Sequence, residues 1–174
     1  MTKNLEIATR YCREVDFLLY GKQHTVISFA NSTGGYELRN ENFKGSSSPK
    51  EVTLIDNKSD DLVVFEGFFS FLSFATVNKK QTAPLSNCLI LNSLSFFEKN
   101  RPVMEKYKQV HLLLDRDHAG KNCTAKTLQW DADKYIDRSD FYQGRKDLNE
   151  WLIHHTHSQQ QSLRSQQPIR RLRS

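Results

Sequence analysis

Long apolar runs are absent from this chain of 174 residues. A helix that spans a bilayer needs roughly 18 apolar residues in succession. A chain with 37% hydrophobic residues and a mean hydropathy of −0.65 contains no such run. The first residues, MTKNLEIATRYCRE, also lack the apolar stretch of a signal peptide. We therefore exclude a membrane-spanning protein and expect a cytoplasmic one with no membrane partner.

Cysteine is also scarce. Cys12, Cys88 and Cys123 are odd in number and far apart, and none of them forms a C-x-x-C pair. A disulfide framework or a zinc knuckle needs cysteines in closely spaced pairs. We therefore expect three free thiols. The sequence also contains no internal repeat.

The net charge of +5 is unevenly distributed. After His154 the chain contains no acid and four arginines, at positions 164, 170, 171 and 173. Without these four the remaining chain has a net charge of +1, so the basicity belongs to the C-terminal end. Such an end can bind phosphate non-specifically or keep a disordered segment in solution, and the sequence leaves both readings open. The three histidines of HHTH could suggest a metal site, but in this polar segment we do not expect them to bind one.

The first 60 residues predict a small β-rich subdomain with a leading helix. The helix is predicted over residues 5–15, from the apolar positions Leu5, Ala8 and Cys12. The extended runs HTVISFAN and YELRN are joined by STGG, and paired glycines between β-rich runs favour a hairpin. FKGSSSPK predicts a flexible basic loop, and EVTLID predicts a further strand.

From residue 61 to residue 157 short apolar runs alternate with helical segments. The predicted strands are LVVFEG, NCLILN and QVHLLLD, and the predicted helices are FFSFLSFATVNK, SFFEKNRPVMEKY, GKNCTAKTLQWDADKY and DLNEWLIHH. This alternation is typical of βαβ units, so we expect an α/β fold with a mainly parallel sheet flanked by helices. Residues 158–174 are polar and of low complexity, and predict a disordered basic tail.

Two of these strands end in acids. Glu66 and Gly67 follow LVVF, and Asp115 and Asp117 follow HLLL with Gly120 close behind. A lone Glu-Gly or Asp-x-Asp is usually an ordinary strand end or a helix cap. In a parallel sheet, however, the carboxyl ends of neighbouring strands meet at one edge, where ligands bind. Clustered carboxylates suit Mg²⁺.

VVFEGFFSFLSF together with VHLLLDRDHAGKN resembles the TOPRIM domain, the catalytic module shared by bacterial (DnaG-type) primases, topoisomerases and some nucleases. The resemblance covers residues 62–152 and rests on a glutamate after one strand and Asp-x-Asp after a later one. It implies a Rossmann-like sheet. The preceding glycine-rich hairpin and basic loop resemble those of primase-like proteins of mobile genetic elements. KDLNEWL resembles the closing lysine-aspartate-asparagine motif of that group.

The resemblance implies roles for individual residues. Glu66 would act as general acid/base or metal ligand, Asp115 and Asp117 would bind Mg²⁺ (with Mn²⁺ as a substitute), and Asp147 would help to hold the metal or the local geometry. The basic residues expected to contact template or nucleotide phosphate are Arg39, Lys44, Lys50, Lys121 and Lys146. Exposure on a solvated surface would explain Arg39, Lys44 and Lys50 equally well, whereas Lys121 and Lys146 lie nearer the acids. His118 departs from the family, in which many members carry an acid or a polar residue at this position.

The function implied is Mg²⁺-dependent RNA primer synthesis on single-stranded DNA from nucleoside triphosphates, in replication or transfer of a mobile element. A helicase or a mobilisation protein would be the partner. The chain shows no cysteine/histidine cluster for the N-terminal zinc-binding domain that such primases usually carry. Two alternatives remain: a TOPRIM nuclease that uses the same acids, and a catalytically weak accessory protein that binds DNA.

Overall fold

Five short strands form the central sheet, in the order β5-β7-β6-β8-β9. The computed structural model of the protein describes residues 2–79 and 86–165. The strands are β5 (Thr53–Ile55), β6 (Asp61–Phe65), β7 (Asn87–Ile90), β8 (Gln109–Leu113) and β9 (Tyr135–Asp137). β6 pairs in parallel with both β7 and β8, β8 pairs in parallel with β9, and β5 is an antiparallel edge strand beside β7. The predicted α/β class with a mainly parallel sheet is confirmed.

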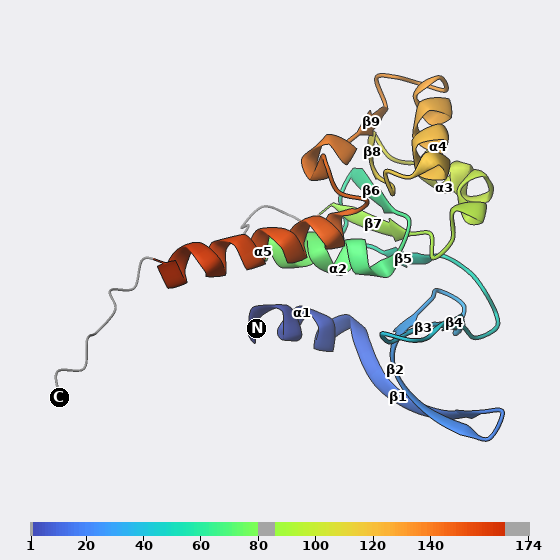
Figure 1. Ribbon diagram of the computed structural model, residues 1–174. Helices are drawn as coiled ribbons and strands as arrows, with labels where there is room; N and C mark the ends of the chain where they lie inside the picture. Colours follow the sequence, from blue (N-terminus) through green and yellow to red (C-terminus); the bar gives the residue numbers. More distant parts are fainter. Residues whose placement is uncertain (1, 80–85, 166–174) are drawn as a thin grey trace.

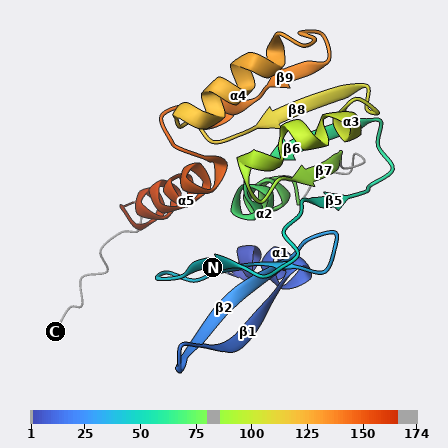
Figure 2. The ribbon, with the colours of Figure 1, turned by 90° about the vertical axis from the view of Figure 1, so that its right-hand side faces the viewer.

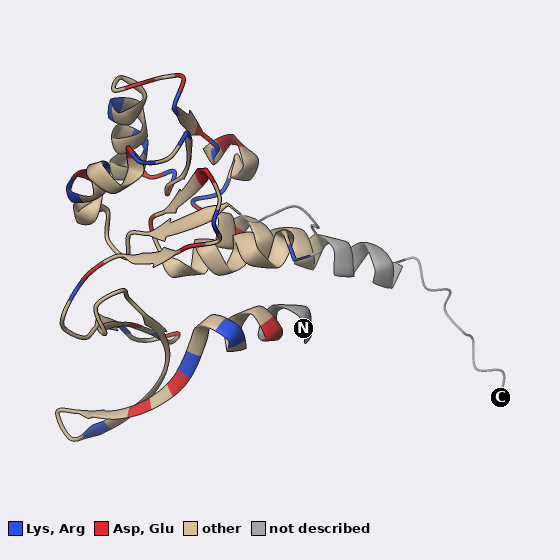
Figure 3. Ribbon diagram, turned by 180° about the vertical axis from the view of Figure 1, so that it is seen from behind, with Lys and Arg blue, Asp and Glu red and all other residues tan. Residues whose placement is uncertain are grey.

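Helices cover both faces of this sheet, which is why its inner strands are apolar on both sides. One face carries α2 and α5, side by side, and the other carries η1, η2, α3 and α4 (Figure 1). Figure 3 shows that α2 carries no charged residue along its length. The bounds are α2 (Phe68–Val77), η1 (Leu94–Phe96), η2 (Glu98–Asn100), α3 (Arg101–Met104), α4 (His118–Leu128), η3 (Ser139–Tyr142) and α5 (Leu148–Ser165).

A second, antiparallel sheet precedes the central one and packs against α2. Its strands, in the order β1-β2-β3-β4, follow the helix α1. The bounds are α1 (Thr2–Tyr11), β1 (Cys12–Leu19), β2 (Lys22–Ala30), β3 (Tyr36–Arg39) and β4 (Lys44–Ser46). Figure 2 shows α2 between the central sheet above and this N-terminal sheet below. The contact is apolar, because Phe29 of β2 is buried and its ring stacks on that of Phe68.

The predicted hairpin at STGG is confirmed, since β2 and β3 pair in antiparallel register across it. The predicted helix over residues 5–15 is wrong in its last third, because the chain turns into β1 at Cys12. β1 is an edge strand with mostly exposed side chains, so it lacks the alternation that would have revealed it. Part of the predicted basic loop is also a strand, β4.

The later differences have local causes. The helix predicted over residues 120–135 ends at Leu128, because the Asp131 carboxylate accepts hydrogen bonds from the backbone of Asp133 and Lys134 and turns the chain into β9. The helix predicted over residues 95–107 is two 3-10 turns followed by α3, with Pro102 in its first turn.

Two predicted segments lie elsewhere than expected. The strand predicted at EVTLID belongs to the central sheet as β5 and not to the N-terminal sheet. The tail predicted from residue 158 begins within α5, which continues to Ser165, and residues 166–174 of that prediction lie outside the described residues. Within residues 2–79 and 86–165, no helix has the length and apolarity needed to cross a membrane.

Gly120 lets α4 begin against the end of β8. A Cβ atom at this position would lie 2.0 Å from the Asp115 carbonyl oxygen, so Gly120→Ala should force the helix away from the strand end. We expect the free energy of unfolding to fall by about 2 kcal/mol or more, as measured by urea denaturation.

Gly67→Ala is the matched control, because a Cβ atom there meets nothing within 4 Å and the backbone is extended. This change should alter the free energy of unfolding by less than about 1 kcal/mol. Equal losses for the two variants would contradict the proposed close contact of α4 with Asp115.

Candidate active site

The carboxyl ends of three adjacent strands bring polar side chains to one edge of the central sheet. Phe65 of β6 is level with Ile90 of β7 on one side and with Leu113 of β8 on the other. Because the three strands are parallel and in register, the residues that follow them emerge together. Asn92 follows β7, Glu66 follows β6 and Asp115 follows β8.

Glu66 occupies the centre of this edge. Its Oε2 atom is buried and has no hydrogen-bond partner within the described part of the chain. Burial, and after it the negative charges of Asp115 and Asp117, together raise the pKa of Glu66 from its ordinary value of 4.5 to about 7, against the opposing effects of the Asp115 backbone and Lys146. At neutral pH this carboxyl group is therefore poised to take up or release a proton.

The two aspartates of Asp-x-Asp differ in role. Asp117 is the N-cap of α4, because its Oδ1 accepts a hydrogen bond from the Gly120 backbone at 3.0 Å. Asp115 is more buried, and its pKa is raised by that burial and by the nearby charge of Asp147. His118 is the first residue of α4 and lies at the molecular surface beside the Asn122 side chain.

Lys146 supplies positive charge among these acids. Its Nζ atom lies 3.4 Å from Oδ2 of Asp115 and 3.9 Å from Oδ2 of Asp117. The carboxylates raise the pKa of the ammonium group, with Asp115 contributing most. The lysine is held from behind, because its carbonyl oxygen accepts a hydrogen bond from the Arg116 backbone at 2.7 Å.

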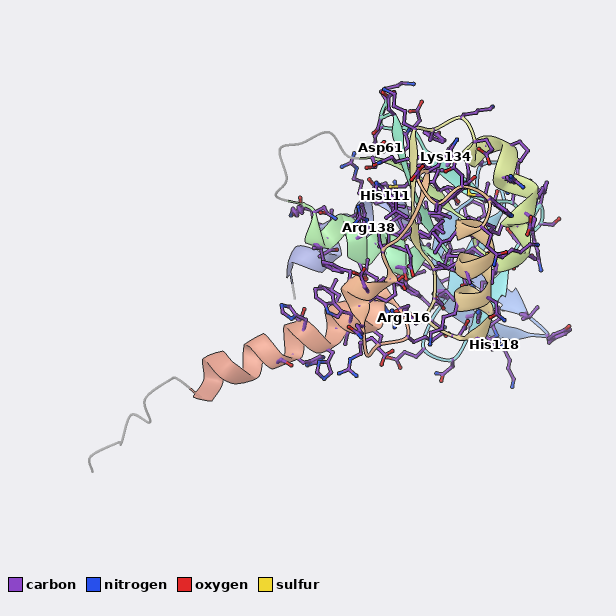
Figure 4. All side chains as sticks on the ribbon, turned by 90° about the horizontal axis from the view of Figure 1, so that it is seen from above. Asp61, His111, Arg116, His118, Lys134 and Arg138 are labelled. Atoms are coloured by element: carbon purple, nitrogen blue, oxygen red, sulfur yellow. The ribbon has the colours of Figure 1, made fainter. Side chains whose placement is uncertain are left out.

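The KDLNEWL segment turns into α5 through a reciprocal cap. Oδ1 of Asp147 accepts a hydrogen bond from the Glu150 backbone at 2.8 Å, and Oε2 of Glu150 accepts one from the Lys146 backbone at 2.8 Å. This arrangement satisfies backbone donors at the start of the helix and fixes Lys146 and Asp147 beside Asp115. Figure 4 shows His111 of β8 beside Arg138, which follows β9, and Nε of Arg138 donates to Nδ1 of His111 at 3.3 Å.

A cleft of about 800 Å³ runs between this edge and the N-terminal sheet. Its lining includes seven of the nine predicted site residues, and these are Arg39, Lys44, Lys50, Glu66, Asp115, Lys146 and Asp147. Asp117 and Lys121 do not line it: Asp117 contacts Lys146, and Lys121 is exposed on the first turn of α4. The cleft therefore has Glu66, Asp115 and Asp147 on one wall, with Lys146 among them, and Arg39, Lys44 and Lys50 on the other, with Glu37 beside Arg39.

Local packing explains the position of the cationic wall. Oδ1 of Asn31 accepts a hydrogen bond from the Gly35 backbone at 2.9 Å, while its Nδ2 donates to the Pro49 carbonyl at 2.7 Å. A Cβ atom on Gly35 would lie 2.0 Å from that same carbonyl oxygen, so only glycine allows the loop to dock here. The docked loop places Lys50 in the cleft.

The cations on this wall are not equivalent. Arg39 forms an ion pair with Glu37 at 2.8 Å and donates to the Gly45 carbonyl at 2.6 Å, so its guanidinium group is largely engaged within the sheet. Lys44 and Lys50 are exposed residues of the same wall. Because Lys44 and Lys50 are exposed, they are better placed than Arg39 to contact an anion that enters the cleft.

Divalent-metal binding would require a change from the arrangement described. Within residues 2–79 and 86–165, no three His, Cys, Asp or Glu side chains converge closely enough to hold an ion. The donor set nevertheless suits Mg²⁺: the oxygens are hard, the buried Oε2 of Glu66 has no partner in the described chain, and the pKa values of Glu66 and Asp115 are raised by burial and, after it, by neighbouring negative charge. Lys146 now offsets part of that charge.

Asn92 and Phe69 are among the residues of the cleft lining that were not predicted from the sequence. Asn92 lies at the end of β7, and Phe69 lies in the first turn of α2. Asn92 could have been found by applying the strand-end rule to NCLILN as well as to the acidic strands. Nothing in the local pattern distinguishes Phe69 from the other aromatic residues of FFSFLSF.

Comparisons with known proteins agree with this architecture. A family model described as Toprim-like matches residues 63–152, and one described as a domain of unknown function (DUF8464) matches residues 4–48. The fold is similar to the crystal structure of the primase fragment of the bacteriophage T7 primase-helicase protein, with a TM-score of 0.59 and 18% identity over 95% of this chain and 69% of that one. No curated protein matches the sequence.

A second solved structure is similar as well. In it the bacteriophage T7 lagging-strand DNA polymerase interacts with primase domains bound to an RNA/DNA hybrid and dTTP. The TM-score is 0.61 and the identity 19%, over 92% of this chain and 84% of that one. At these identities the comparison establishes a shared fold.

The raised pKa of Glu66 predicts a pH-dependent stability of the metal-free protein. The folded state holds the proton up to about pH 7 and the unfolded state only to about 4.5, so Glu66 destabilises the fold progressively as pH rises through this window. Glu66→Gln should therefore unfold at higher urea concentration than wild type above about pH 7. The gain should be on the order of 1 kcal/mol, because solvent screens the partly exposed site, and it should vanish near pH 4.5.

The Asp115→Asn background tests the cause. Removing that charge lowers the pKa of Glu66, so the gain from Glu66→Gln should shrink there. A gain that is the same at every pH would rule out titration of Glu66 as its origin.

Proposed function

The chain belongs to the Toprim-like family, and from this premise we propose that it is a primase-like nucleotidyltransferase that synthesises RNA primers on single-stranded DNA. The observation that supports the proposal best is the cleft itself. It sets Glu66, Asp115 and Asp147 opposite Lys44 and Lys50, at the carboxyl edge of a parallel sheet. Carboxylates that face cations across one cleft suit a substrate that carries both metal and phosphate.

The two parts of the chain would share the work. Residues 61–157 would form the catalytic unit, and residues 1–60 would supply the wall that holds phosphate. Lys44 and Lys50 would contact the backbone of the template or the phosphates of the nucleotide, and Arg39 would mainly brace this wall through Glu37 and Gly45. Lys121, one turn into α4, lies outside the cleft and would meet only a strand that leaves it.

Glu66 is the residue best suited to move a proton. In the primer-forming reaction a 3′-hydroxyl attacks the α-phosphate of a nucleoside triphosphate, the bond between the α- and β-phosphates breaks, and pyrophosphate leaves. The proton of the hydroxyl group must be accepted. The Oε2 atom of Glu66 is buried and has no partner among the described residues, and the pKa of the group is about 7. Glu66 would therefore accept that proton near neutral pH.

Asp115 and Asp117 would hold Mg²⁺, with Asp147 supporting Asp115, and Mn²⁺ would substitute. Glu66 would be a further ligand only in the alternative in which it does not accept the proton. When bound, the ion would neutralise charge on the phosphates during transfer. Lys146 would then no longer be needed to offset the acids, and its ammonium group would be available to phosphate.

The similar solved structures support the choice of substrate. One of them contains primase domains bound to an RNA/DNA hybrid and dTTP, and the other is a fragment of a primase-helicase protein. By analogy, a helicase or a mobilisation protein would deliver the single-stranded template, in replication or transfer of a mobile element within the cytoplasm.

The test is primer synthesis in vitro. The wild-type protein, incubated with single-stranded DNA, nucleoside triphosphates and Mg²⁺ or Mn²⁺, should make short RNA oligomers. Asp115→Asn should reduce the yield at least about 100-fold, because it removes a metal ligand and with it several kcal/mol of charge stabilisation. Asp133→Asn, at an exposed position in the loop before β9, is the matched control and should retain wild-type activity.

The other outcomes identify the alternatives. Nicked DNA without oligomers would replace the primase with a nuclease that uses the same acids. Intact DNA with salt-sensitive binding would indicate an accessory DNA-binding protein. Oligomers made equally well by Asp115→Asn would show that the acidic edge is not the active site.

A further inference from the structure

Three phenyl rings form a column that leads from the interior to the cleft. The ring of Phe29, on β2, stacks on that of Phe68 with centroids 5.0 Å apart and planes at 6°. The ring of Phe68 stacks in turn on that of Phe69, at 4.4 Å and 29°. Phe29 and Phe68 are each only 2% exposed, whereas Phe69 is 39% exposed and lines the cleft. The column therefore ends at a ring that is accessible from the cleft.

The position of Phe69 is more specific than that of a scattered surface aromatic residue, which would need no explanation. Its ring is supported by a buried neighbour and lies three residues after Glu66 along the chain. A flat apolar surface fixed in this way loses little conformational freedom when another flat ring stacks on it. Arg39, whose guanidinium lies 5.9 Å from the centre of the Phe68 ring, braces the column from the N-terminal sheet.

An acceptor in the same cleft also has no partner in the described structure. Nδ2 of Asn92 donates to the Glu51 carbonyl at 2.9 Å and to Oγ1 of Thr53 at 3.3 Å, which fixes the orientation of the amide. Its Oδ1 atom is then left buried without a hydrogen-bond partner among the described residues. Buried acceptors are nearly always satisfied in folded proteins. Because Asn92 lines the cleft while its Oδ1 atom is itself buried, a donor on a ligand would reach this atom after a small movement of the cleft lining.

We propose that Phe69 and Asn92 form a nucleobase subsite, in which a base stacks on the Phe69 ring and donates an N–H group to Oδ1 of Asn92. A nucleotide is the ligand class that combines a flat base, which has N–H donors on its edge, with an attached phosphate. Lys44 and Lys50 line the same cleft and suit that phosphate. The subsite rests on the proposed function for its substrate class, and on the ring column and the unpaired acceptor for its location.

The stacking is tested with 2-aminopurine, whose fluorescence is quenched when the base stacks. One arm uses a short single-stranded oligodeoxynucleotide that contains 2-aminopurine, and the other uses 2-aminopurine riboside triphosphate, both without added divalent metal. Wild type should quench the probe in at least one arm, and that arm tells whether the base belongs to the template or to the nucleotide. Phe69→Leu should lose the quenching and bind that probe about tenfold more weakly.

Two variants control for folding and for general aromatic contacts. Phe69→Trp keeps a stacking face and should restore the quenching. Phe141→Leu removes a ring that is 50% exposed outside the cleft and should behave as wild type. A Phe69→Leu variant with wild-type quenching and affinity would overturn the subsite, as would an absence of quenching by wild type in both arms.

The acceptor is tested from the ligand side, so that Asn92 and its structural bonds stay intact. Wild type should bind adenosine triphosphate or an adenine-containing oligomer several-fold more tightly than the purine counterpart, which lacks the exocyclic amine. Equal binding would remove Asn92 from the subsite.

These measurements separate the subsite from the proposed function. Quenching by a wild-type protein that makes no primers would leave the subsite and reject the polymerising activity. Primer synthesis, together with probe affinity and quenching that do not depend on Phe69, would leave the polymerising activity and reject the subsite.

Discussion

The parallel pairing of β6 with β8 determines the chemistry of this molecule. Phe65 and Leu113 are level across that pair, so the residues after them must emerge at the same edge and on neighbouring strands. Glu66 and Asp115 are brought to a partly buried edge, where burial and, after it, the charges of neighbouring carboxylates raise the pKa of each group. Like charges arranged in this way store unfavourable free energy that a cation can release. The sheet thus builds an affinity for positive charge before any ligand arrives, and Lys146 meets part of it.

The residues that hold this edge in place are the same ones that give it charge. Asp117 caps α4, Asp147 caps α5, and Lys146 is fixed by a hydrogen bond from Arg116 and by the cap with Glu150. Each helix therefore begins at the site with a carboxylate that uses one oxygen for its cap, and the second oxygen of Asp117 faces Lys146. A carboxylate at a helix N-terminus is also favoured by the helix dipole. Fold stability and site geometry consequently place the same demand on these positions, and a substitution there affects both.

The sequence was sufficient for the parts of the fold that depend on strong local patterns. β6, β7 and β8 are short apolar runs with polar ends, so these strands and the acids after them could be predicted. The two adjacent glycines before Tyr36 indicate a turn, so the hairpin could be predicted as well. β1 could not, because an exposed edge strand lacks alternation, and β9 is only three residues long. The position of Phe69 and Asn92 in the lining of the same cleft could not be predicted either, since it depends on packing between segments distant in sequence.

The contact between the two sheets connects these observations. Phe29 belongs to the N-terminal sheet and Phe68 to the helix that follows Glu66, and their stacked rings are the apolar joint that closes the cleft. Because Phe69 continues the same stack, the ring that faces the cleft is positioned by the packing that sets the distance between its cationic and acidic walls. A small shift of the N-terminal sheet would move Lys44 relative to Glu66 and would change the packing of Phe29 on Phe68 that supports the outer ring. The stacked rings therefore couple the place where phosphate would be held to the place where a base would stack. A ligand that contacts both walls of the cleft would stabilise the packing between the two sheets.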